Sequence, residues 1–80
     1  MLTKGLAAAL APAIQVNAVG PGVLLPKGFS RAVEQKITAR IPMGRHGAPD
    51  DVAEAVYFFA TCPRYITGQL LFVDGGATAV

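Results

Sequence analysis

The segment with the clearest potential for chemistry is an apolar run that ends in Gly20-Pro21-Gly22. Glycine has no side chain and tolerates unusual backbone angles, so a ligand can approach the main chain closely there. Proline fixes φ and removes an amide donor, which interrupts regular strand pairing. The pattern predicts a strand that ends in a turn whose backbone can lie against a ligand.

Side chains that could act as acids, bases, nucleophiles or metal ligands are few and scattered. His46 is the single histidine and Cys62 the single cysteine, so neither is expected to take part in a metal site. A lone cysteine also excludes an internal disulfide and fits a reducing, cytoplasmic setting. We interpret Tyr57 and Tyr65 as packing residues and Asp74 as a cap of the turn that follows it.

Positive charge is concentrated between residues 27 and 45, where Lys27, Arg31, Lys36, Arg40 and Arg45 accompany Glu34 alone. Such a cluster could attract an anionic ligand or a nucleic acid. We favour the alternative, the solvated face of an amphipathic helix, because no aromatic residues alternate with the cations. We therefore expect no nucleic-acid partner. No apolar run approaches the ~20 residues of a membrane span, so no membrane partner is expected.

Apolar residues that recur every three or four positions predict three helices. The first covers Leu2 to Leu10, and Pro12 ends it. The second follows an N-cap at Ser30 and forms a lid-like helix with the basic residues on its outer face. The third covers residues 49–62 and begins at a proline, with two aspartates in its first turn. Its apolar surface is wide, which predicts burial between two layers.

Two strands are predicted between these helices. Ile14 to Val19 contains β-branched residues and leads into the Gly-Pro-Gly turn. Leu70 to Val73 is continuously apolar, as in a strand covered on both faces. A strand–helix–strand crossover places its two strands parallel. The sequence thus predicts an α/β fold in the order helix, strand, lid helix, helix, strand.

The chain has 80 residues, of which 52% are hydrophobic. A domain of this size buries only ~60% of its unfolded surface, so part of this apolar surface is expected to need a partner.

Several segments, in this order, resemble the C-terminal part of a short-chain dehydrogenase/reductase. They are Leu2-Thr3-Lys4-Gly5-Leu6-Ala7, Asn17 to Gly22, Pro42 to Arg45, Ala48 to Ala53, and Ile66 to Gly76. The resemblance implies the C-terminal portion of a Rossmann-type doubly wound parallel sheet. Residues 1–80 would then be a partial domain that lacks the N-terminal dinucleotide-binding half. The family's Gly-rich motif, catalytic Ser and Tyr-x-x-x-Lys have no counterparts in this sequence, and we expect them upstream of Met1.

The resemblance also implies a cofactor contact. In the family the Pro-Gly turn passes beside the nicotinamide ring, so Pro21 and Gly22 would shape the pocket wall. The Val23 main chain would bind the carboxamide of NAD or NADP. Many relatives carry a threonine where this chain has Pro26, which cannot donate to the cofactor phosphates. The run from Gly20 to Pro26 is similar to pteridine-reductase-like members.

Two functional hypotheses follow. The first is a C-terminal segment of an NAD(P)-dependent oxidoreductase that reduces carbonyl, alcohol or pteridine-like substrates, with no catalytic or metal residue in this chain and no activity alone. Its partner would be the missing N-terminal half or another subunit of the family. The second is a non-catalytic interaction module that docks on such a subunit or forms a homo-oligomer through the 49–62 helix and the 70–73 strand.

Overall fold

The computed structural model describes residues 2–22, 28 and 30–79 of the chain. Its elements are α1 (Leu2–Leu10), β1 (Ala18–Pro21), α2 (Arg31–Thr38), α3 (Pro49–Thr61), β2 (Leu70–Val73) and the 3₁₀ turn η1 (Ala77–Ala79). The predicted order of helix, strand, helix, helix and strand is therefore confirmed.

The two strands pair in parallel, as the crossover predicted. Ala18 lies opposite Leu70, and Pro21 lies opposite Val73. A backbone hydrogen bond closes each end of the pair: Ala18 N donates to Gln69 O over 2.8 Å, and Gly22 N donates to Val73 O over 2.9 Å. Both strands therefore end side by side, and their carboxyl ends point the same way.

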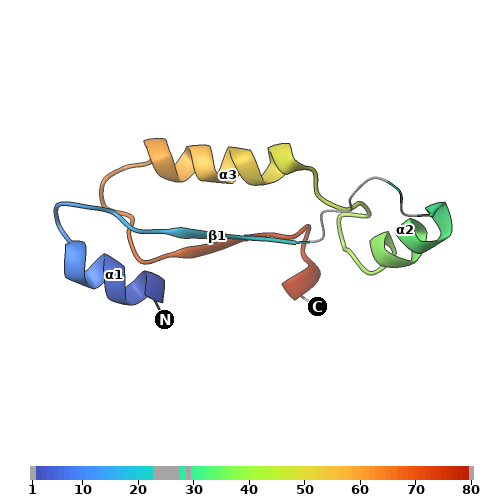
Figure 1. Cartoon of the computed structure of the whole chain (residues 1–80), viewed down its shortest axis with the longest axis horizontal. Coiled ribbons are helices and arrows are strands. Elements are labelled where there is room, and N and C mark those ends of the chain that lie inside the picture. Colours follow the sequence, from blue (N-terminus) through green and yellow to red (C-terminus); the bar gives the residue numbers. More distant parts are fainter. Residues whose placement is uncertain (1, 23–27, 29, 80) are drawn as a thin grey trace.

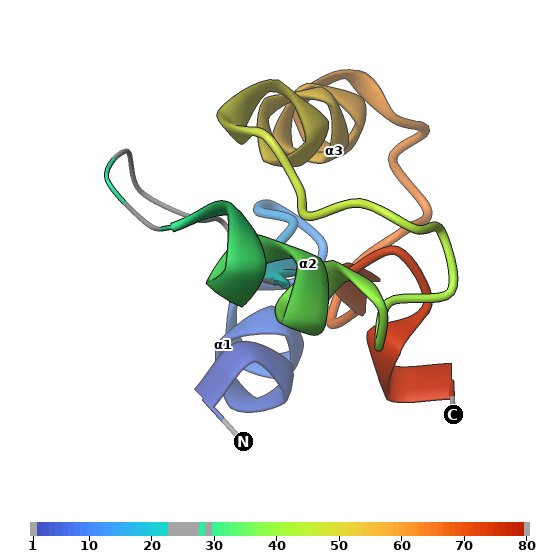
Figure 2. The ribbon, with the colours of Figure 1, turned by 90° about the vertical axis from the view of Figure 1, so that its right-hand side faces the viewer.

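Helices lie on both faces of this two-stranded sheet. Figure 1 shows α3 along one face, and α1 on the other side near the amino ends of the strands. Figure 2 gives the same order of layers from the side. Helix α2 lies beyond the carboxyl ends of both strands. This three-layer arrangement confirms the predicted α/β fold class.

The first strand covers Ala18–Pro21 rather than the predicted Ile14 to Val19, so Gly20 and Pro21 belong to the strand instead of ending it. Residues 14–17 precede the ladder and are fastened mainly by side chains, beside one backbone hydrogen bond from Gly68 N to Val16 O over 2.7 Å. The Gln15 amide donates to Pro63 O over 3.1 Å and to Ile66 O over 2.7 Å. The Asn17 amide donates to Ile66 O and accepts from Gln69 N. These side-chain hydrogen bonds join the two segments before the strand ladder begins at Ala18.

The ends of the helices follow the predicted capping signals. Ser30 caps α2, since its Oγ accepts from Val33 N over 3.2 Å. Pro49 occupies the first turn of α3 together with Asp50 and Asp51. The starts of α2 and α3 are therefore set by local sequence.

Little of the apolar surface is buried inside this chain. Among the described hydrophobic residues, only Ala7 and Ile41 fall in the buried class, at 3% and 7% exposure. The prediction that α3 is buried between two layers is wrong within this chain, because α3 packs on the sheet alone. The prediction that β2 is covered on both faces is likewise wrong, since Phe72 is 52% exposed.

The tyrosines differ from their interpretation as packing residues. Tyr57 is 70% exposed and Tyr65 is fully exposed. Neither side chain meets a second layer in the described part of the molecule. Within the same residues, no helix is both long and apolar enough to span a bilayer.

The closeness of the two strand ends makes Gly22 sensitive to substitution. A Cβ at Gly22 would lie 2.7 Å from Asp74 Cα, a backbone atom that cannot rotate away. We expect Gly22→Ala to lower the free energy of unfolding by about 1–3 kcal/mol, the usual cost of overpacking. Urea unfolding measures this loss.

Gly20→Ala is the matched control for this prediction. A Cβ there would meet Phe72 Cδ1 at 2.7 Å, but the exposed ring can turn aside. A smaller loss than for Gly22→Ala is expected, and equal losses would contradict the steric argument.

Candidate functional site

The candidate site lies at the carboxyl ends of β1 and β2. The pairing of Pro21 with Val73 brings Gly22, directly after β1, beside the turn that begins at Asp74. In open parallel sheets, ligands bind at this edge because loops from several strands converge there. The structure thus joins two glycine-containing motifs that lie far apart in the sequence.

Two of the three residues predicted to contact the cofactor can be placed. Pro21 is exposed at the end of β1, and Gly22 is half-buried directly after it. Val23 lies outside the described residues, and so does Pro26. Pro21 has no amide hydrogen and the Gly22 amide is bonded to Val73 O, so these two residues contribute shape to the site rather than free donors.

Asp74 holds the neighbouring turn in place. Its carboxylate accepts from Thr78 Oγ1 over 2.6 Å, from Gly76 N over 3.0 Å and from Thr78 N over 3.2 Å. These bonds, led by the Thr78 hydroxyl, lower the pKa of Asp74. The interpretation of Asp74 as a turn cap is confirmed.

The same turn packs against the segment that follows α2. Met43 N donates to Gly75 O over 3.0 Å, and the Ile41 side chain is buried against this turn. Gly75 has a φ of +62°, and a Cβ there would lie 2.8 Å from Ile41 Cγ2. Glycine is therefore required at this position both for its backbone conformation and for space.

A small cavity lies between this segment, the start of α3 and the end of β2. Its volume is about 130 Å³, and its walls include Ile41, Met43, Val73 and Asp74. Ligand pockets usually measure ~300–1,000 Å³. The cavity is thus too small to be a nicotinamide pocket by itself.

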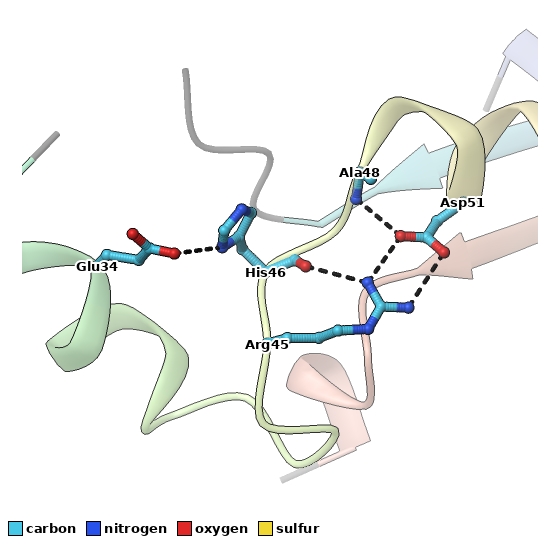
Figure 3. A network of polar contacts seen from close by, with 5 residues as sticks. All are labelled: Glu34, Arg45, His46, Ala48 and Asp51. Atoms are coloured by element: carbon cyan, nitrogen blue, oxygen red, sulfur yellow. Dashed lines mark hydrogen bonds and ion pairs between the residues drawn. The ribbon is translucent and has the colours of Figure 1, made fainter. Parts of the chain in front are cut away.

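The loop before α3 carries a polar network, shown in Figure 3. Arg45 binds the Asp51 carboxylate with two hydrogen bonds, Nη1 to Oδ2 over 2.9 Å and Nη2 to Oδ1 over 3.2 Å. Asp51 Oδ2 also accepts from Ala48 N over 2.7 Å. The Arg45 hydrogen bond, and after it the Ala48 amide, lower the pKa of Asp51 to about 2.

The sequence interpretation missed this network. It assigned Asp51 to the helix dipole and Arg45 to a solvated face. The acid at the third helical position was a usable signal, because an acidic residue there can reach back to the N-cap amide. No local rule connects Arg45 with Asp51 across the intervening loop.

The remaining polar side chains do not gather into a reactive cluster. Within the described ranges, no three His, Cys, Asp or Glu side chains are grouped so that they could hold a metal ion. His46 faces Glu34, with 3.4 Å between Nδ1 and Oε1. The start of α3 carries Asp50 and Asp51, and these acids make that helix terminus unfavourable for a phosphate.

Asp51→Asn tests the contribution of the charged network to stability. Asp51 has a folded pKa of about 2 against an ordinary 3.8. Because the folded pKa is the lower one, the stabilisation is complete above the ordinary value and is lost as the pH falls through about 2. We expect wild type to be more stable than Asp51→Asn near neutral pH, and this difference to vanish in strong acid. Unfolding by urea at a series of pH values measures it.

Asp50→Asn is the matched control, since Asp50 shares the first turn of α3 but lies outside the network. This variant should keep the acid dependence of wild type. An Asp51→Asn protein that also keeps it would contradict the assignment.

Comparison with known proteins places the chain in a family. A family model described as enoyl-(acyl carrier protein) reductase matches residues 1–78. The 3-oxoacyl-[acyl-carrier-protein] reductase FabG of Aquifex aeolicus is 42% identical over 79 residues, which cover 92% of this chain and 32% of the relative. The 3alpha-hydroxysteroid dehydrogenase of Mediterraneibacter gnavus is 43% identical over 81 residues, which cover 95% of this chain and 32% of the relative.

Solved structures of similar proteins point to the same family. A short chain dehydrogenase from Leptospira borgpetersenii with bound NAD⁺ superposes with a TM-score of 0.86 at 38% identity, over 96% of this chain and 31% of that one. An apo SCOR enzyme from Clostridium thermocellum superposes with a TM-score of 0.83 at 35% identity, over 99% of this chain and 30% of that one. The chain spans about a third of the length of these proteins, and its α/β unit is a portion of their Rossmann-type sheet. The chain belongs to the short-chain dehydrogenase/reductase family.

Proposed function

We propose that this chain forms one part of an NAD(P)-dependent oxidoreductase. In that enzyme it supplies a wall of the nicotinamide pocket and a lid over the substrate. The observation that supports this most directly is that Pro21 and Gly22 lie at the carboxyl ends of two parallel strands, with α2 beyond them. The NAD⁺ bound to the Leptospira relative supports the choice of cofactor class.

The residues present suit one wall of such a pocket. Pro21 and Gly22 leave the strand end free of bulky side chains, so that a flat ring can lie against the backbone. The Val23 main chain would bind the carboxamide. NAD and NADP both satisfy this contact, because it does not involve the ribose phosphate.

The pyrophosphate of the cofactor requires residues outside this wall. A helix N-terminus that follows a glycine-rich turn is the usual anion site. Here the start of α3 carries two aspartates, and the Ser30 hydroxyl caps α2. We therefore propose that another segment of a longer protein, or another subunit of the family, binds the phosphates.

The proton donor for carbonyl reduction must also come from elsewhere. Hydride transfer to a carbonyl needs an acid within hydrogen-bond reach of the oxygen. Tyr65 precedes β2 and so lies at the end of the sheet opposite the Pro21 turn, and Tyr57 is exposed on α3. We propose that the complete enzyme acts on a carbonyl or alcohol, or on a pteridine-like compound, in the cytoplasm.

Activity measurements on the purified chain test this proposal. We expect no carbonyl-dependent oxidation of NADH or NADPH, because the acid and the phosphate site are supplied by other residues. Turnover that is lost on mutation of a residue in this chain would contradict the proposal. The second sample combines the chain with the part of the Leptospira dehydrogenase that it does not match. A combined sample that folds but binds no NADH would argue against the pocket wall.

A second candidate function is a non-catalytic interaction module. The observation that favours it is the exposed apolar surface of α3 and β2, which includes Val56, Tyr57, Phe58, Leu71 and Phe72. Exposed apolar patches of this kind commonly mark protein interfaces. The proposed partner is a second copy of the chain or a subunit of the family.

Light scattering during size-exclusion chromatography tests this second function. A discrete dimer is expected, and Tyr57→Ser should shift it towards monomer because it removes an aromatic ring from the proposed interface. Tyr65→Ser is the matched control, since Tyr65 is fully exposed and lies outside α3 and β2. A monomer at all concentrations, or equal effects of both variants, would exclude this interface.

A further inference from the structure

We propose that Glu34 and His46 form a pH-sensitive latch, which holds α2 against the loop before α3 when the imidazole is charged. The latch regulates the same site as the proposed function, and its role in catalysis rests on α2 being the substrate lid. The contact itself, however, can be measured without any cofactor or substrate.

The geometry of the pair is the first argument. His46 Nδ1 lies 3.4 Å from Glu34 Oε1, and Figure 3 shows the ring and the carboxylate turned toward each other. This nitrogen is shielded from solvent and makes no hydrogen bond with any described residue. A buried polar atom without a partner is costly, so the carboxylate is its natural acceptor once the nitrogen carries a proton.

Protonation decides whether the pair attracts. A charged imidazole has donors at both ring nitrogens. A neutral imidazole either donates a weaker, uncharged hydrogen bond from Nδ1 or, with its hydrogen on Nε2, directs the Nδ1 lone pair at the carboxylate oxygen. The charged ring adds an electrostatic attraction that neither neutral form has. Histidine is the side chain whose charge normally changes between about pH 5 and 8. A gain of charge on the ring should therefore tighten the contact.

The other charged groups near His46 are already engaged. Arg45 Nη1 donates to the His46 carbonyl over 3.2 Å and also binds Asp51. The pKa of Asp51 is about 2, so this part of the network does not change near neutral pH. Arg45 and Asp51 thus hold the His46 backbone in place and leave Glu34 as the carboxylate that faces the ring.

The pair is also the one polar contact between α2 and another element that the described residues record. The hydrogen bonds of α2 run within the helix or to its caps, such as Val33 N to Ser30 Oγ and Thr38 Oγ1 to Gln35 O. The segment behind the helix is tied down separately, by the bond from Met43 N to Gly75 O. Loss of the Glu34–His46 contact would therefore release the body of α2 while its base stays attached.

Amide hydrogen exchange of residues 31–40 in the 80-residue chain tests the latch. Exchange is compared at about pH 5.5 and about pH 8, within the range in which histidine changes charge, after correction for intrinsic rates. The pair is partly exposed, with side-chain exposures of 32% and 43%. Protection at the lower pH should accordingly rise by only about two- to five-fold. Glu34→Gln and His46→Gln should each remove the rise.

Two controls make the result decisive. Glu54→Gln makes the same chemical change on α3, away from His46, and should leave the rise intact. Salt screens a partly exposed ion pair, so added sodium chloride should reduce the rise in the unmutated chain. This second measurement applies even if a variant fails to fold.

The latch is overturned if wild type shows no rise, if Glu34→Gln retains it, or if salt leaves it unchanged. Hydrogen exchange reports on α2 in the absence of cofactor. Failure of the proposed oxidoreductase function would appear as absent NADH binding in the combined sample, with the exchange result unaffected.

Discussion

The parallel pairing of β1 with β2 is the constraint on which the rest of the structure depends. The pair is short, and two isolated strands are rarely stable in water. Side chains reinforce it at its amino end, where Asn17 bonds to Gln69, 52 residues further along the chain. At the carboxyl end the Gly22 amide closes the ladder on Val73. A slip of one residue would separate the Gly22 and Asp74 turns and dismantle the candidate site.

The distribution of burial explains why so small a unit has so much apolar surface. Helix α3 covers one face of the sheet and α1 lies on the other side near the amino ends of the strands, and nothing in the described chain covers the helices in turn. The leucines of α1 illustrate this, because Leu2 is 78% exposed while Ala7 is buried. The relatives are about three times as long as this chain.

The sequence predicted those elements whose signals are local. Proline and aspartates define the start of α3, and a serine hydroxyl defines the start of α2, so both were predicted closely. The predicted start of β1 was wrong because the side chains of Gln15 and Asn17 bind the 63–69 loop. No local sequence pattern shows whether an amide side chain will bind where a strand ladder could form. Burial was predicted wrongly for α3 and β2. Hydrophobicity shows which surfaces are unfavourable in water, but not whether other residues of the same chain pack against them. Pro21 and Gly22 were correctly expected at a strand end, whereas the Arg45–Asp51 pair depends on a loop path that sequence does not specify.

The position of Pro21 in the ladder has a consequence for the outer side of β1. Gly22 directs its amide to β2, so the nitrogen of the preceding residue faces the opposite way, and in proline that nitrogen carries no hydrogen. Any strand laid along this side would find a donor at Val19 but none at the next outward position. A strand that paired along this side would therefore lose one backbone hydrogen bond at Pro21.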